Sequence, residues 1–155
     1  MKHSIKLRFA VIIAASTIIA SCGKYPDGPN LSLTSKTERV AGTWKIDQYY
    51  ENGVDYTSEY RKRVVNESFV LEKDGKYTIS ATGPTSGCPI NPHPGQTDTD
   101  SGTWEFIDKK EQFTMQTNLP NWPKKTYQIL KLKKKEMWVK QVSTNGTTIE
   151  LHFIQ

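Results

Sequence analysis

A thiol and an imidazole lie close together in the longest irregular stretch of the chain, which runs from Thr82 to Asp100. Cys88 and His93 are five residues apart, and catalytic thiols are commonly activated by a nearby histidine. The prolines around them stiffen the intervening backbone, which disfavours a catalytic pair. The stretch itself is either a solvated insertion, the reading we favour, or a lid over a binding site. The role predicted below for Cys22, the other cysteine of the chain, leaves Cys88 without a partner, so we predict a free thiol or an intermolecular bridge at Cys88.

No other set of residues has the spacing of a metal site or a catalytic centre. The run Asp98-Thr99-Asp100 lacks the glycine and the distant glutamate of a calcium-binding loop. The three histidines are far apart, and His152 alternates with apolar neighbours in a way that predicts exposure to solvent. The sequence contains no Ser-His-Asp set, phosphate loop or dinucleotide fingerprint. We expect no enzymatic activity, no metal and no cofactor.

The N-terminus carries the strongest signal in the sequence. Lys2, His3, Lys6 and Arg8 precede an uncharged run of twelve residues, Phe9 to Ala20. A helix of that length spans roughly 18 Å, too short for a hydrocarbon core of about 30 Å. The pattern predicts a signal peptide over residues 1–21.

The end of this leader, Ile19-Ala20-Ser21-Cys22, resembles the lipobox of bacterial lipoproteins. The resemblance implies that Cys22 receives a diacylglyceryl group and becomes the first residue of the mature chain. Two or three acyl chains, such as palmitate, would give a stable anchor. Gly23 in place of aspartate favours an outer-membrane lipoprotein, on either its periplasmic or its surface face. The alternative is an ordinary secretory signal with a chance cysteine.

Residues 22–38 are rich in turn-forming residues and predict a lipidated, flexible tether. Residues 39–155 are long enough for one domain. The chain carries 21 basic and 16 acidic residues, and the leader holds three of the basic ones. The remaining 18 against 16 leave about +2, which gives no reason to expect a nucleic-acid partner.

From Arg39 onward, short runs of alternating apolar and polar residues are separated by turn signals such as Asn145-Gly146. About eight strands result, and in the first of them Trp44, Ile46 and Tyr50 fall on one side. Only Thr57 to Val65 looks helical. The alternation fails near Ile129, which suggests a β-bulge. The pattern predicts an all-β, eight-stranded antiparallel up-and-down barrel with one short helix, and a β-sandwich is the main alternative.

Gly42-Thr43-Trp44, at the start of this meander, resembles the Gly-x-Trp motif of lipocalins. The mature chain as a whole is similar to the lipocalin-like lipoproteins of Bacteroidota, and the similar stretches are YPDGPNLSL, AGTWKI, FVLEKDGKYTI, SGTWEF and TTIELHFIQ. The resemblance implies a cup-shaped cavity for a small molecule. In lipocalins the tryptophan also packs under a basic residue from a late strand, for which several lysines between Lys124 and Lys140 are candidates.

The leading hypothesis is a membrane-anchored, non-enzymatic lipoprotein of the cell envelope whose barrel binds a small apolar or amphipathic ligand. The alternative is a filled barrel that serves as a protein-interaction or inhibitor module. The lysine-rich turn from Leu132 to Glu136 is interpreted as a soluble hairpin tip. The candidate ligand-binding residues are Trp44, Ile46, Phe69, Leu71, Tyr77, Ile79, Trp104 and Phe106.

Overall fold

A computed structural model of the chain describes residues 33–82 and 97–155. These residues form one antiparallel sheet in the order β2-β1-β3-β4-β5-β6-β7-β8-β9, and β1 also pairs with β9. That last pairing closes eight strands into a barrel without a free edge, which confirms the predicted up-and-down barrel over a sandwich. The strands are β1 (Gly42–Glu51), β2 (Val54–Asp55), β3 (Val65–Leu71), β4 (Lys76–Thr82), β5 (Thr97–Ile107), β6 (Gln112–Thr117), β7 (Lys125–Leu132), β8 (Glu136–Val142) and β9 (Thr148–Ile154).

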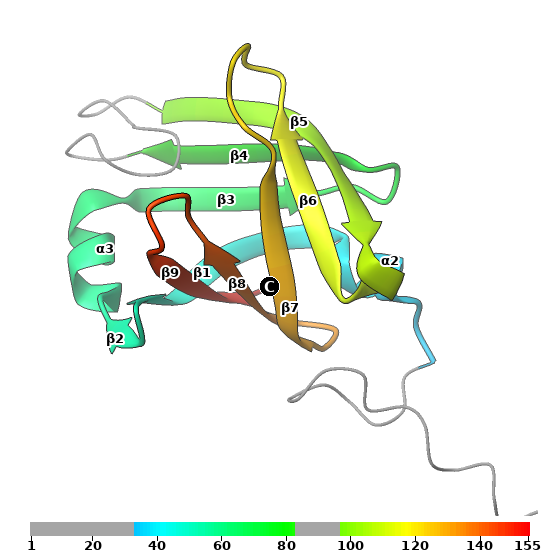
Figure 1. The fold of residues 1–155 in the computed structure, drawn as a ribbon, viewed down its shortest axis with the longest axis horizontal. Helices are drawn as coiled ribbons and strands as arrows, with labels where there is room; N and C mark the ends of the chain where they lie inside the picture. The colour runs from blue at the N-terminus through cyan, green and yellow to red at the C-terminus, as the bar shows by residue number, and fades with distance from the viewer. Residues whose placement is uncertain (1–32, 83–96) are drawn as a thin grey trace, which may run out of the picture.

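Two short helices lie at opposite ends of the barrel, α2 (Lys36–Val40) and α3 (Thr57–Arg63), and a 3₁₀ turn, η1 (Asp108–Lys110), joins β5 to β6 (Figure 1). Helix α3 is two residues shorter than predicted, because Val65 already pairs with β4. No helix within the two described ranges is long and apolar enough to span a membrane.

Helix α2 was not predicted, and it begins inside the segment interpreted as a tether. Its cap is local: Ser35 Oγ accepts a hydrogen bond from Glu38 N at 3.1 Å, and Ser35 N donates to Glu38 Oε2 at 3.0 Å. This capping box is visible in the sequence as Ser-x-x-Glu. Arg39 then anchors the helix, because its buried guanidinium donates to the backbone oxygen of Leu132 at 2.7 Å.

The predicted side of Tyr50 is wrong. Pairing between β1 and β9 skips Asp47, so a β-bulge reverses the alternation after Ile46. Tyr49 therefore follows Trp44 and Ile46 on the inner face of the barrel, while Tyr50 points outward. A bulge near Ile129 was predicted from the same kind of irregularity, and the β7–β8 register shift between Ile129 and Lys131 confirms it.

Both ends of the stretch that was predicted to be irregular, Thr82 to Asp100, lie in strands. Strand β4 includes Thr82, and β5 begins at Thr97, directly opposite it. The β-branched threonines of this run fit a strand, and pairing with β4 overrides the weak strand propensity of the aspartates. Residues 83–96, with Cys88 and His93, lie outside the described residues.

The end of the barrel that carries α2 is filled by side chains. Trp44 is fully buried there, and its indole Nε1 donates to the backbone oxygen of Val40 at 2.8 Å. Trp104 lies in a second Gly-Thr-Trp run and repeats the arrangement, donating to the backbone oxygen of Glu72 at 2.9 Å. At Gly42, where φ is +155°, an added Cβ would lie 2.3 Å from Nε2 of the flexible Gln155 side chain, so the backbone conformation is the main reason for glycine here. We refer to this end as the closed end.

Lys133, Lys134 and Lys135 form the exposed turn between β7 and β8, in agreement with the predicted hairpin tip. None of the basic residues from Lys124 to Lys140 is buried against Trp44. The buried basic residue at the closed end is Arg39, which comes from the helix that precedes β1.

Candidate ligand cavity

The barrel encloses a cavity of about 660 Å³. It extends from the core to the end of the barrel that carries α3, which we call the α3 end. The described residues that line it come from all eight barrel strands, from α3 and from the β6–β7 connection. A cavity of this volume lies within the range of small-molecule sites in proteins.

Six of the eight candidate ligand-binding residues line this cavity, and two do not. The six are Trp44, Ile46, Phe69, Leu71, Tyr77 and Ile79. Trp104 and Phe106 lie toward the closed end, where their rings pack edge to face with centroids 5.3 Å apart. Trp104 is only 5% exposed, so its ring is part of the packed core.

The candidate set also omitted the lining contributed by the second half of the chain. Strands β6, β8 and β9 contribute an apolar wall, with Phe113, Met115, Met137, Val139, Ile149, Leu151 and Phe153. The same alternation that identified the first half marks these positions too. The polar residues of the lining carry no such signal, because a polar residue at an inward position breaks the pattern.

Polar contacts inside the cavity are concentrated around Asp100 of β5. Its Oδ2 accepts a hydrogen bond from the Tyr77 hydroxyl at 3.1 Å, and its Oδ1 accepts one from the Thr117 hydroxyl. Burial and the neighbouring Asp100 charge raise the pKa of Tyr77 to about 12. Burial also raises the pKa of Tyr127, again with a contribution from Tyr77 and Asp100. Both phenols therefore remain protonated donors at neutral pH.

The α3 end of the cavity combines both signs of charge with exposed aromatic surface. Glu51, Arg63 and Lys125 line it, at the ends of β1 and α3 and at the start of β7. Leu119 and Trp122, on the connection between β6 and β7, also line it and are each 51% exposed. Trp122 thus lies at the end of the cavity where a ligand would enter or leave.

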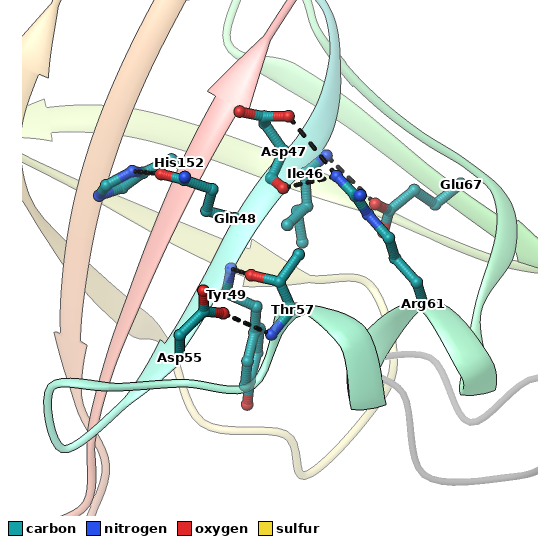
Figure 2. A network of polar contacts seen from close by, with 9 residues as sticks. All are labelled: Ile46, Asp47, Gln48, Tyr49, Asp55, Thr57, Arg61, Glu67 and His152. Carbon is teal, nitrogen blue, oxygen red and sulfur yellow. Dashed lines mark hydrogen bonds and ion pairs between the residues drawn. The ribbon is translucent and has the colours of Figure 1, made fainter.

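Helix α3 fills the gap that opens where β1 leaves β3, since those strands pair only from Gly42 to Trp44. Arg61 Nη2 donates to the backbone oxygen of Asp47 at 2.8 Å and lies 3.5 Å from its carboxylate (Figure 2). The rings of Tyr49 and Tyr60 stack with centroids 5.0 Å apart. The helix therefore forms part of the cavity wall.

Glu67 occupies the same gap. Its carboxylate accepts a hydrogen bond from the backbone N–H of Ile46 at 3.1 Å (Figure 2) and another from the Tyr60 hydroxyl. Burial raises the pKa of Glu67 above its ordinary value of 4.5, and these hydrogen bonds offset only part of that effect.

A pH dependence follows from the raised pKa of Glu67. The protonated form is favoured in the folded state, so this contribution to stability is fully present below about pH 4.5 and is lost as pH rises through the folded pKa. We expect urea unfolding from pH 4 to 7 to show the native chain losing stability relative to Glu67→Gln. Glu105→Gln, an exposed control on β5 with a lowered pKa, should show no such loss, because the contribution of Glu105 is already present above about pH 4.5. Parallel curves for the native chain and Glu67→Gln would contradict the assignment.

The predicted exposure of His152 is wrong. The side chain points away from the cavity, yet the residue is only 8% exposed. Its cross-strand neighbour Trp138 stacks on it with centroids 4.0 Å apart, and its ring nitrogens lie 2.6 Å from Gln48 Oε1 and 2.7 Å from Glu150 Oε1. Lys131 Nζ lies over the Trp138 ring, 3.8 Å from its centroid. Alternation assigned the correct face of β9, but it carries no information about which neighbours cover that face.

Among residues 33–82 and 97–155 there is no group of three or more histidine, cysteine, aspartate or glutamate residues placed to hold a metal ion. Residues 83–96, with Cys88 and His93, lie outside the described ranges, so the favoured solvated insertion, the alternative lid and the free thiol at Cys88 stay predictions.

Fold and cavity together define the class of this protein: a lipocalin-like, eight-stranded up-and-down barrel with an internal cavity. No protein-family model matches the chain, and no curated protein matches it. The function of the chain is therefore inferred from the geometry of the barrel and its cavity.

Proposed function

We propose that this chain is a membrane-anchored, non-enzymatic lipoprotein of the Bacteroidota lipocalin-like type, whose barrel binds a small apolar or amphipathic molecule in the cell envelope. The observation that carries the binding proposal is the cavity of about 660 Å³ with a largely apolar wall. Transfer of apolar ligand surface from water into such a cavity supplies roughly 25 cal/mol per Å². The polar groups at Asp100, Tyr77 and Tyr127 would orient the ligand.

The cavity favours this function over a filled barrel that acts as an interaction module. In a filled barrel, inward side chains from opposite strands meet and leave no room for a ligand. Here Trp44 and Trp104 fill the closed end, and a ligand-sized space lies between them and α3.

Ligand binding can be tested with a neutral environment-sensitive dye after solvent extraction of the protein. We expect the dye to bind the native chain and to bind about tenfold more weakly to the double variant Ile79→Trp, Leu151→Trp, because two indoles intrude on the cavity from different walls. Val142→Trp is the control, since Val142 is 62% exposed. Mass spectrometry of the extract should also reveal a co-purified small molecule. No dye binding together with an empty extract would favour the interaction module.

The anchor depends on Cys22 and the leader that precedes it. We expect Cys22→Ser to move the protein from the detergent phase to the aqueous phase, because the sulfur that carries the lipid is absent. Cys88→Ser removes the other cysteine of the chain and should leave partitioning unchanged. Retention of Cys22→Ser in the detergent phase would contradict lipidation at Cys22.

A further inference from the structure

Asp100 is a carboxylate inside an apolar cavity without a cationic partner among the described residues. Its two hydrogen bonds come from neutral hydroxyls, those of Tyr77 and Thr117. A carboxylate has about four lone-pair positions, so it can still accept further hydrogen bonds. An ion in such surroundings lacks the compensation that an opposite charge gives.

Asp100 forms no ion pair with the other described charged residues that line the cavity. Of the described lining residues, the charged ones are Glu51, Arg63, Asp100 and Lys125. Glu51 ends β1, Arg63 ends α3 and Lys125 begins β7. Asp100 instead lies three residues inside β5 and bonds to Tyr77, which is 3% exposed. None of the other three charged residues of the described lining forms an ion pair with Asp100, so its carboxylate is open to a cationic group of a ligand.

The surroundings of Asp100 are aromatic and hold a second acceptor. Tyr127 lines the same cavity as Asp100, and its ring stacks on Phe113 with centroids 5.2 Å apart. Its hydroxyl has no hydrogen-bond partner in the described part of the chain. Aromatic faces attract cations, and a phenol oxygen accepts a hydrogen bond from an ammonium group.

We propose that Asp100, with Tyr77 and Tyr127, forms a subsite for the protonated amine of an amphipathic ligand whose apolar part fills the rest of the cavity. This inference rests on the proposed ligand-binding function and specifies its ligand class. An alkylammonium carries three donors, and Asp100 and Tyr127 offer the acceptors to receive them. The neutral Tyr77 and Thr117 hydroxyls hold the carboxylate in place.

Three probes of equal chain length, decylamine, decanol and decanoate, distinguish binding at the amine subsite from binding anywhere in the cavity. Each probe is titrated by calorimetry at pH 7 into the full chain carrying Cys22→Ser. We expect decylamine to bind at least about tenfold more tightly than decanol, and decanoate more weakly than decanol. Equal binding of amine and alcohol, or preference for decanoate, would overturn the amine subsite while leaving the cavity function intact. Failure of all three probes to bind would overturn the proposed function as well.

Two variants assign the preference to the subsite. Asp100→Asn is expected to lower decylamine affinity about tenfold and to leave decanol binding unchanged, since the substitution removes charge and little volume. Glu105→Gln removes an acid from the outer face of the same strand, where it pairs with Lys124 at 2.9 Å, and should retain the full preference. Tyr127→Phe, which keeps the stacked ring, should lose part of it. An amine preference that survives Asp100→Asn would show that the cation binds elsewhere.

Discussion

Replacing Trp44 with alanine is expected to lower the free energy of unfolding by about 4 kcal/mol, as is typical of large-to-small changes in a packed core. Trp44 is fully buried between the cavity and α2. The substitution removes the indole, leaves a void at the closed end and leaves the Val40 carbonyl without the donor that now lies 2.8 Å away. Urea unfolding followed by circular dichroism measures the loss.

Trp122→Ala is the matched control for this substitution. That residue is 51% exposed on the β6–β7 connection, so its removal should cost less than about 1 kcal/mol. Equal losses for the two variants would contradict the assignment of Trp44 as the residue that closes the barrel. Trp44→Phe should recover part of the stability, because it restores apolar volume but not the N–H donor.

The sequence predicts the architecture well because a barrel repeats one simple rule. Inward residues alternate with outward ones in every strand, and turn residues such as Asn145-Gly146 mark where strands reverse. Closure is harder to predict, since it depends on β1 reaching β9 across nearly the whole chain. The number and length of the predicted strands made a closed barrel the best prediction.

Predictions from the sequence were wrong where a single residue changes the strand register. They were also wrong where the surroundings of a side chain come from strands far away in the sequence. Asp47 forms a β-bulge that moves Tyr49 inward, and an aspartate at this position does not by itself predict a bulge. His152 is covered by Trp138, a neighbour defined only by pairing between β8 and β9. Asp100 was missed for a related reason. Acids and threonines in series look like a loop, and only pairing with β4 turns Asp100 into the wall of a cavity.

Gly102→Ala is expected to destabilise the barrel by about 3 kcal/mol, through steric overlap between two backbones. A Cβ at this position would lie 2.0 Å from the backbone oxygen of Gln116 and 2.9 Å from the Cα of Thr117. Neither atom belongs to a flexible side chain, so β5 and β6 must separate. Because Gly102 pairs with Thr117, and Thr117 donates to Asp100, the separation should also weaken any preference for an amine ligand.

Gly146→Ala distinguishes this steric cost from the conformational cost of losing a glycine. Gly146 has φ +84° in the β8–β9 turn, and an added Cβ there would meet nothing within 4 Å. Its replacement therefore costs only the unfavourable left-handed backbone, about 1 kcal/mol, and should leave the cavity unchanged. If Gly102→Ala is no more destabilising than Gly146→Ala by urea unfolding, β5 and β6 can move apart at little cost. The position of Thr117 against Asp100 would then not depend on the close approach of these two strands.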